Sequence, residues 1–271
     1  MRVLYLGDIV GRSGRALVLE KLPELREKLK LDLVVVNGEN AAAGFGITRK
    51  ICDQLLEGGV DVITTGNHIW DQKETVQFIS QEKRLIRPIN FPKGTPGIGA
   101  GIYEAGRGRT ALIINVMGRI FMDPLDDPFA AVEEELGRHR LGQTVNFILV
   151  DIHCEATSEK QAMGHFCDGR VSFVVGSHSH VPTADAHILE GGTAYQTDAG
   201  MCGDYNSVIG MEKEEPLQRF TRKIATGRFS PAMGEGTLCG VFVETDDRSG
   251  LAKRIEPVRL GAHLHGAFPE L

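Results

Sequence analysis

The sequence lacks the cysteine pattern of a disulfide framework or a thiolate zinc site. Its five cysteines, an odd number without a CxxC pair, are Cys52, Cys154, Cys167, Cys202 and Cys239. Small disulfide-bonded domains and structural zinc sites need paired cysteines at characteristic spacings. A reducing compartment is therefore the simplest setting.

The chain also lacks an excess of positive charge. Its 36 Asp and Glu residues outnumber its 30 Lys and Arg residues, and the formal net charge is -6. A single Trp and four Tyr give no sign of an aromatic-rich basic surface for long RNA. No global field would hold nucleic acid, so a phosphate-bearing substrate needs local charge, for which bound metal ions are the obvious source.

A long apolar segment is missing at the N-terminus. The apolar run 1–6 ends at a Gly-Asp turn. Six residues are too few for the core of a signal peptide and far too few to span a membrane. We expect a cytoplasmic protein with no membrane partner.

What the sequence does contain, in its first half, is an alternation of candidate strands and helices. Apolar runs predict strands over residues 2–6, 31–36 and 60–64, and helical periodicity predicts helices over 15–30, from Thr48 to Gly58, and over 71–78. This βαβαβ order predicts a parallel sheet with right-handed crossovers.

The middle of the chain predicts strands over 110–116, 145–151 and 171–175, a helix begun by Pro128, and a helix or lid over 158–164, while the run 98–103 lies between turn signals. The last third carries shorter strand-like runs over 186–189, 193–196, 237–244 and 253–260. Short strands late in an α/β chain indicate a second sheet packed on the first. With no linker or repeat in the sequence, we expect one domain over residues 1–271.

Six short segments bring metal-ligand side chains to the ends of these elements. They are Gly7-Asp8, residues 37–40, residues 66–68, Asp151-Ile152-His153, residues 176–180 and, more weakly, residues 198–200. Most follow an apolar run that predicts a buried strand. Because ligands bind at the carboxyl ends of strands in open α/β folds, we expect these side chains to converge.

Taken singly, each segment has an ordinary structural explanation. Asp8 could cap the following helix, Glu39-Asn40 could form a turn, Asn67 could be a helix cap, and His153 could be a satisfied polar residue. Taken together they are harder to dismiss, and they supply donors enough for two metal ions.

The nitrogen and oxygen donors narrow the choice of metal. His178 and His180 flank one residue on an extended segment, so both imidazoles can point the same way. With carboxylates, carboxamides and a further imidazole, they form a mixed set that suits iron, manganese or zinc and not calcium or thiolate sites.

The ordered set of segments resembles the calcineurin-like metallophosphoesterase superfamily, and within it the bacterial YmdB-like family. The strings that carry the resemblance span residues 7–11, 37–42, 44–48, 65–68, 151–160 and 176–185. It runs from Met1 to about Gly210 and is less distinctive beyond. The resemblance implies a four-layer α/β/β/α sandwich of two mixed sheets flanked by helices.

Two departures from the wider superfamily fit the narrower family. The usual Asp-x-His at the first segment is absent, since Asp8 is followed by Ile9 and Val10. The bridging carboxylate is Glu39 where the superfamily commonly has Asp, and the neighbouring Asn40 could replace the missing imidazole.

The resemblance implies a ligand set for two divalent transition-metal ions, with iron ahead of manganese or zinc. Asp8, Glu39, Asn40 and His180 would hold the first ion. Asn67, His153 and His178 would hold the second, with Glu39 bridging the two.

The resemblance also implies an activity, that of a 2′,3′-cyclic-nucleotide 2′-phosphodiesterase. Hydroxide bridging the two metals would attack phosphorus, and His68, which is not needed as a ligand, would protonate the leaving alkoxide. A small nucleotide or a generic phosphodiester is the expected substrate.

Weaker candidates surround this set. Ser13 lies in the turn after Asp8 and could contact a phosphate oxygen. Thr157, Ser158 and Lys160 follow His153 and could cover the substrate. Asp71 lies three residues after His68, where it could orient the imidazole or be a plain exposed acid.

Two alternatives stay open on the sequence alone. Within enzymes, the chain could be a broad phosphomonoesterase or a nuclease acting on short RNA ends. From another class, it could be a regulatory or scaffold protein that retains metals with little turnover. Neither the oligomeric state, a homo-oligomer included, nor the native metal is readable from these residues.

Overall fold

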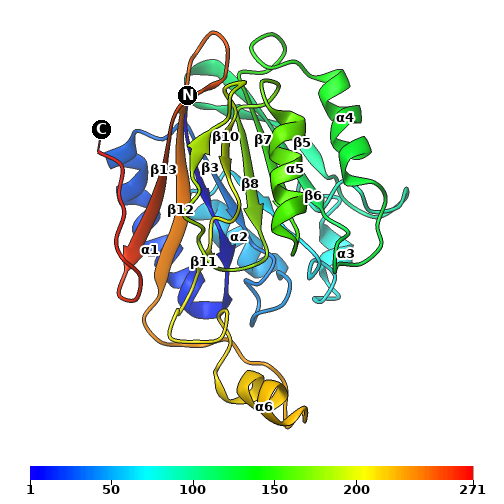
Figure 1. Ribbon diagram of the computed structural model, residues 1–271, viewed down its shortest axis with the longest axis vertical. Helices are drawn as coiled ribbons and strands as arrows, with labels where there is room; N and C mark the ends of the chain where they lie inside the picture. Colours follow the sequence, from blue (N-terminus) through cyan, green and yellow to red (C-terminus); the bar gives the residue numbers. More distant parts are fainter. Residues whose placement is uncertain (271) are drawn as a thin grey trace.

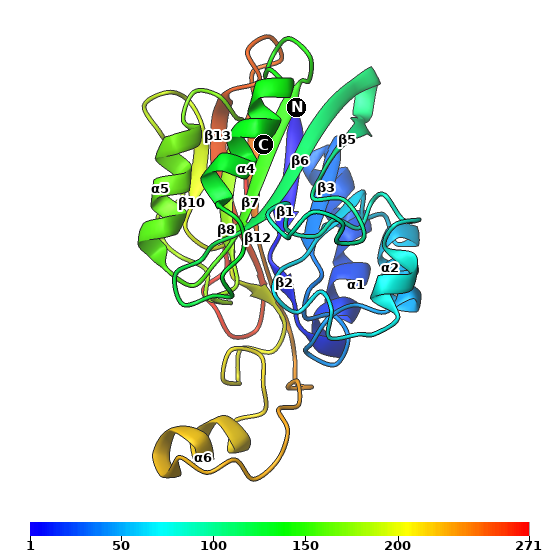
Figure 2. The ribbon, with the colours of Figure 1, turned by 90° about the vertical axis from the view of Figure 1, so that its right-hand side faces the viewer.

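A computed structural model describes residues 1–270 of the chain. Two β-sheets pack face to face, with α1 and α2 on the outer face of one sheet and α4 and α5 on the outer face of the other (Figures 1 and 2). The four-layer α/β/β/α arrangement expected from the sequence is therefore confirmed.

The first sheet has five strands in the order β13-β12-β1-β3-β4. Strands β1, β3 and β4 run parallel to one another, as the βαβαβ pattern predicts, while β12 is antiparallel to β1 and β13 is antiparallel to β12. The bounds are β1 Arg2–Leu6, β3 Leu33–Asn37, β4 Val62–Thr64, β12 Thr237–Thr245 and β13 Ala252–Gly261.

The second sheet has six strands in the order β5-β6-β7-β8-β10-β9. Its bounds are β5 Ala100–Ala105, β6 Arg109–Met117, β7 Phe147–His153, β8 Phe173–Ser177, β9 His187–Ile188 and β10 Ala194–Gln196. A separate pair joins β2 (Asp8–Ile9) to β11 (Met201–Cys202).

Six α-helices and one short 3₁₀ turn lie within residues 1–270. They are α1 Gly11–Leu29, α2 Arg49–Glu57, α3 Thr75–Phe78, η1 Gly106–Gly108, α4 Pro128–Arg138, α5 Thr157–Cys167 and α6 Glu214–Arg222. Thr48 caps α2 as expected, and its side chain accepts a hydrogen bond from the amide of Ile51. None of these helices combines the length and apolar composition of a membrane span.

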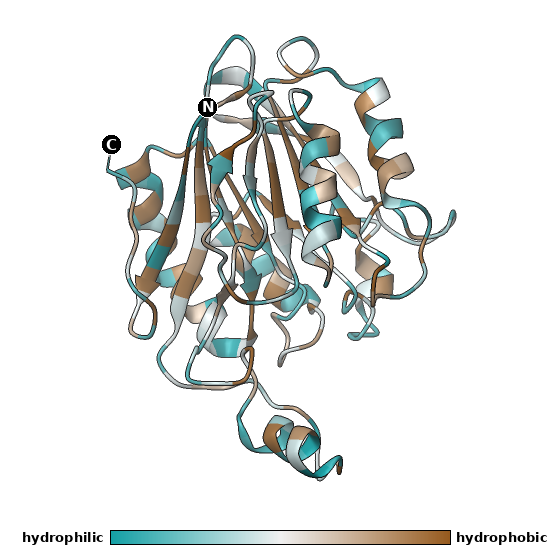
Figure 3. Cartoon of the chain, viewed as in Figure 1, coloured by the Kyte–Doolittle hydropathy of each residue, from teal (hydrophilic) through white to brown (hydrophobic). Residues whose placement is uncertain are grey.

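Strand alternation explains the layers. In β1, Leu4 and Leu6 face the helices, whereas Val3 and Tyr5 belong to the apolar layer between the two sheets. A third layer joins the second sheet to α4 and α5. Figure 3 shows both sheets as mostly hydrophobic, which fits strands covered on both faces. The strands whose ends carry polar groups therefore lie between apolar layers.

The expectation that the late strands form the second sheet is confirmed for β9 and β10 and is wrong for β12 and β13. β12 and β13 extend the first sheet beside β1, and the second sheet is built mainly from the middle of the chain. Periodicity identifies strands but does not show which sheet they join, because that choice depends on contacts between distant residues.

Helix bounds differ in three places. The first helix starts at Gly11, four residues before the expected Arg15. The sequence did not indicate this first turn, because the turn carries no large apolar residue. Gly14 lies so close to β11 that a Cβ there would be 2.0 Å from the Cys202 carbonyl oxygen. The expected helix over 71–78 is limited to α3, and α6 was not predicted at all.

Candidate metal centre

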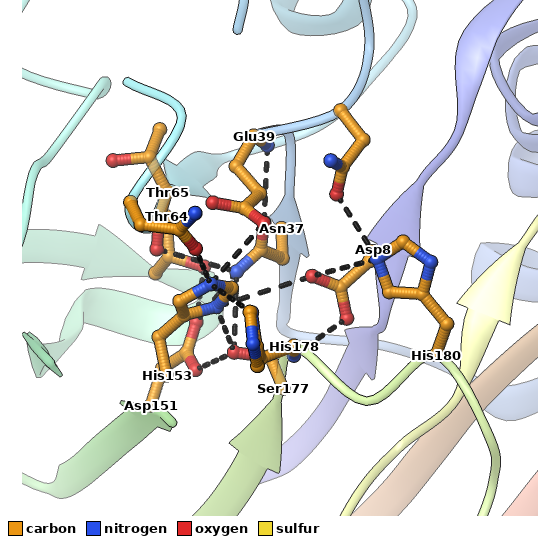
Figure 4. Close-up of polar contacts among 12 residues, drawn as sticks. Asp8, Asn37, Glu39, Thr64, Thr65, Asp151, His153, Ser177, His178 and His180 are labelled. Carbon is orange, nitrogen blue, oxygen red and sulfur yellow. Dashed lines mark hydrogen bonds and ion pairs between the residues drawn. The ribbon is translucent and has the colours of Figure 1, made fainter. Parts of the chain in front are cut away.

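The predicted ligands meet at the carboxyl ends of strands from both sheets. Asp8 follows β1, residues 39–40 follow β3 and residues 67–68 follow β4, while His153 ends β7 and residues 178–180 follow β8. Figure 4 shows these side chains converging, with His153, His178 and Glu39 on one side of Asp8 and His180 on the other. We refer to the seven predicted ligands together as the ligand cluster.

One half of the ligand cluster is centred on Nε2 of His153. It lies 2.9 Å from Asn67 Oδ1, 3.1 Å from Glu39 Oε1 and 3.2 Å from His178 Nδ1. A single N–H cannot donate hydrogen bonds to three such neighbours, and the carboxylate and carboxamide oxygens can only accept hydrogen bonds. Four donor atoms facing one point are what a cation needs.

The other half joins Asp8, Glu39 and His180, whose donor atoms all lie within 4.8 Å of one another. Asn40 Oδ1 adds a fourth donor 3.2 Å from His180 Nε2. Asp8 Oδ1 is buried without any hydrogen-bond partner. An unpaired buried carboxylate oxygen is costly unless something compensates it, so this atom fits a bound cation.

The imidazoles are held in the tautomers that ligation requires. His180 Nδ1 donates to the carbonyl of Ile209 at 2.7 Å, which leaves Nε2 free to coordinate. His153 Nδ1 lies 2.9 Å from Ser177 Oγ, which itself donates to Asp151 Oδ1 at 2.7 Å. Such outer partners orient metal-binding histidines.

Asp151 anchors this relay deep in the core. Its other oxygen accepts hydrogen bonds from Tyr5 at 2.8 Å, Thr64 at 2.5 Å and Asn37 at 3.3 Å. Asp151 was predicted only as part of a motif, and its partners were not predicted. Ser177 and His153 each end a strand, and this shared position could have indicated their contact. Nothing in the sequence indicates that Tyr5 contacts Asp151.

The loop that bears His178 and His180 has an unusual backbone. His178 has φ of 93° and His180 has φ of 64°, conformations that cost of order 1–3 kcal/mol for such residues. The His178 amide donates to Asp8 Oδ2 at 3.2 Å. Beneath it, Lys160 Nζ is 2.7 Å from Asp198 Oδ2 and 2.9 Å from Ser179 Oγ.

Lys160 therefore supports this loop from below, and is not part of the cover that was expected over the substrate. Its side chain is 0% exposed and that of Asp198 is 1% exposed. Asp198 Oδ2 also accepts the Ser179 amide at 3.1 Å. The weak sixth segment of the sequence thus holds the histidine loop through this ion pair.

Charges within the ligand cluster are strongly coupled. Burial raises the pKa of Asp8 to about 7. Burial opposes the charge of His153, but the carboxylates of Glu39, Asp8 and Asp151 outweigh it and raise the pKa of His153 to about 9. Burial and the neighbouring His153 lower the pKa of His178 to about 3. Without a cation, His153 is the group that balances the Glu39 charge.

Gly66 gives the ligand cluster its space. A Cβ at this position would lie 2.2 Å from His153 Nε2 and 2.3 Å from Glu39 Oε2. Any side chain there would displace two ligands, which explains the glycine before Asn67.

His68 lies at the edge of the ligand cluster and lines a cavity beside it. Its Nδ1 is 2.8 Å from Asp71 Oδ2, and its amide donates to Glu39 Oε2 at 3.2 Å. Its ring packs edge-on against Phe45, with centroids 5.0 Å apart. A cavity of about 320 Å³ is lined by His68 together with Glu39, and this is the space in which a ligand would meet the cluster.

The predicted substrate contacts lie farther out. Ser13 donates its hydroxyl to the carbonyl of Gly234 at 2.9 Å and lines a different surface depression. Thr157 and Ser158 are both exposed in the first turn of α5. Glu155, whose Oε2 lies 3.2 Å from His178 Nε2, was not predicted as a member of the site.

Comparisons with known proteins found similar sequences and similar structures. A family model described as YmdB-like protein matches residues 4–258. A Bacillus subtilis (strain 168) protein named 2′,3′-cyclic-nucleotide 2′-phosphodiesterase is 46% identical over 95% of this chain and 96% of its own length.

Two solved structures share the whole fold. A protein from Thermus thermophilus superposes with a TM-score of 0.89 at 43% identity, covering 96% of this chain and 99% of that one. A Mycoplasma pneumoniae protein described as a novel phosphatase also gives 0.89, at 33% identity over 96% of this chain and 93% of its own.

Proposed function

This chain belongs to the YmdB-like family, and from that premise we propose that it is a metal-dependent phosphodiesterase that hydrolyses 2′,3′-cyclic nucleotides. The observation that carries the proposal is the pair of donor groups sharing Glu39, with Asp8 Oδ1 left unpaired in the core. The name of the Bacillus subtilis relative supports the substrate class.

The residues suit two divalent cations, although their identity as iron, manganese or zinc rests on donor chemistry alone. Asp8, Glu39, Asn40 and His180 would hold one ion, and Glu39, Asn67, His153 and His178 the other. Bound there, such ions supply Lewis acidity, which lowers the pKa of water and offsets charge on phosphate oxygens.

His68 is the proposed general acid. His68 acts in its doubly protonated form, in which Nδ1–H donates to Asp71 Oδ2 at 2.8 Å and the second proton, on Nε2, passes to the substrate. Hydrolysis adds water to phosphorus and breaks the bond to the 2′ oxygen, which takes that proton. The product keeps its phosphate on the 3′ oxygen.

The first test compares wild type with His68→Ala on 2′,3′-cyclic AMP, using protein purified with its metal. We expect 3′-AMP as product, and a loss in kcat of about 10²–10⁴ with metal content retained. His265→Ala, at an exposed histidine far from the ligand cluster in sequence, is the matched control.

The outcome also separates the alternatives. Equal, negligible turnover by wild type and His68→Ala would favour a metal-retaining scaffold protein. Faster hydrolysis of p-nitrophenyl phosphate than of the cyclic diester would favour a phosphomonoesterase, the class that the description of the Mycoplasma pneumoniae structure names. Preference for short RNA ends would favour a nuclease.

A further inference from the structure

The cavity beside the ligand cluster has two unlike halves. Glu39, His68, His178 and His180 form its polar half. The other half is apolar and is formed by Phe45, Ile209, Met211, Pro216, Phe220 and Phe229. The ligand cluster accounts for the polar half, whereas phosphate chemistry gives no reason for the apolar one.

Three of these residues, Pro216, Phe220 and Phe229, come from one projecting segment, residues 212–231, which we call the α6 arm. Figures 1 and 2 show α6 standing away from the sandwich on two connecting segments of chain. Phe220 is 72% exposed although it lines the cavity. Large aromatic side chains exposed beside a polar site favour a ligand that covers them.

The α6 arm is joined directly to the ligand cluster. Ile209, at its base, accepts the hydrogen bond from Nδ1 of His180 at 2.7 Å. Met211, in turn, packs close to the loop after Glu39, where a Cβ on Gly44 would lie 2.8 Å from its terminal methyl group. The polar and apolar halves of the cavity are therefore contiguous, and one ligand can contact both.

The apolar half suits a flat, uncharged group. Of the described residues that form it, none carries a charge. Arg219, whose guanidinium lies 4.0 Å from the Phe229 ring centroid, is already paired with Glu215 at 2.8 Å. A second phosphate would find no counter-charge here, whereas an aromatic ring would find aromatic faces.

We infer that the apolar half is a nucleobase subsite, in which Phe220 and Phe229 contact the base of a nucleotide whose phosphate lies at the ligand cluster. This inference rests on the proposed function. The cavity volume of about 320 Å³ is at the lower end of the roughly 300–1,000 Å³ typical of ligand pockets, which matches a mononucleotide.

The subsite recognises that a base is present and does not identify which base it is. Its side chains offer rings, aliphatic groups and a thioether, with no hydrogen-bonding group to read a base edge. Stacking on aromatic rings tolerates every base because each has a π-face. The four 2′,3′-cyclic nucleotides should therefore differ little in kcat/KM.

The test compares two substrates that share the cyclic phosphate. One is 2′,3′-cyclic AMP, and the other is methyl β-D-ribofuranoside 2,3-cyclic phosphate, which lacks a base. Wild-type holoenzyme should prefer the nucleotide in kcat/KM by roughly 5- to 150-fold, the value of one base–aromatic contact. Phe220→Ala and Phe229→Ala should bring that ratio towards one, and Phe220→Trp should keep it.

Phe121→Ala is the matched control, since Phe121 is 89% exposed and does not line the cavity. It should leave the ratio at the wild-type value. A wild-type ratio near one, or equal losses on both substrates in Phe220→Ala, would overturn the subsite alone. The subsite would also be overturned if Phe220→Ala kept the wild-type kcat/KM ratio but had a smaller molecular mass in solution than wild type. That result would show that a second copy of the chain covers the arm. Failure to hydrolyse either substrate would refute the proposed function itself.

Discussion

The ligand cluster and the α6 arm are built in opposite ways. Asp8 and His153 are 0% exposed, lie on strand ends between packed layers, and have partners fixed by a buried network. In α6 only Pro216 is buried, while Leu217 and Phe220 in the helix and Ile224 just beyond it are each more than half exposed. The contrast separates chemistry, which needs fixed donors, from substrate contact, which needs an accessible surface.

The same contrast appears in how each region depends on the core. The ligand cluster uses strand ends from both sheets, so any shift between the sheets would change distances among the donors. The α6 arm is joined to the sandwich through its two ends (Figure 2). Changes in the first region should therefore alter metal binding and stability, and changes in the second should alter substrate preference.

Removing the shared carboxylate should have the largest effect. Glu39→Gln keeps the shape but loses the negative charge common to both donor groups. We expect metal content to fall well below two ions per chain and kcat/KM to fall by roughly 10³-fold or more, corresponding to several kcal/mol of lost electrostatic stabilisation. Elemental analysis and turnover on 2′,3′-cyclic AMP measure both. Glu27→Gln, on an exposed face of α1, is the control; full metal content in Glu39→Gln would contradict the assignment.

Breaking the buried pair below the histidine loop should come next. Lys160→Met leaves Asp198 charged and unpaired in the core, which we expect to destabilise the fold by about 3–5 kcal/mol. Urea unfolding gives the free energy of unfolding. Lys160→Met with Asp198→Asn should lose less than the sum of the single changes.

A surface pair provides the matched control for that cycle. Lys253 pairs with Asp246 at 2.7 Å, but their side chains are 61% and 34% exposed. Lys253→Met should change the free energy of unfolding much less than Lys160→Met, because solvent screens an exposed pair. If both lysine variants lost the same amount, the Lys160 pair would not have the structural role assigned to it.

A smaller effect is expected from the serine that orients His153. Ser177→Ala removes the hydroxyl between His153 Nδ1 and Asp151. Metal affinity should fall about 10- to 100-fold, the usual effect of losing such a partner. Competition with a chelator measures it. Ser172→Ala, which removes a buried serine bonded to the Ile148 amide, should leave the affinity unchanged.

The smallest effect should be on the stability of the arm. Phe220→Ala should change the free energy of unfolding by no more than about 0.5 kcal/mol, because an exposed side chain loses little packing. Phe242→Ala, at a fully buried position in β12, should cost about 3–5 kcal/mol. A comparable loss in Phe220→Ala would show that the arm belongs to the cooperative core.

How much was predictable depended on whether a feature is local. Thr48 as a helix cap and Pro128 as a helix start were predicted correctly, because capping and proline geometry act within a few residues. The place of β12 beside β1 was not, since it pairs residues from opposite ends of the chain. The α6 arm went unnoticed because its helix, Glu214–Arg222, is too short for helical periodicity to be recognised in the sequence.

The same distinction holds within the candidate site. The candidate segments stood out because most of them follow an apolar run, whereas the ligand set came from the resemblance to a family, and the metal-binding roles remain a proposal. The roles of Lys160 and Tyr5 were invisible, because a buried lysine and a buried tyrosine are recognised only from the partners that surround them.

The sequence by itself determined which donor types the protein has and that they stand at strand ends, since apolar runs and the polar residues that end them are local properties of the chain. Only the tertiary structure decided which donors share a point in space, that Asp8 Oδ1 is left without a hydrogen bond, and that an aromatic arm lies beside them. The reason is physical: these distances are fixed by how two sheets and their helices pack, and packing depends on contacts among residues that are far apart along the chain.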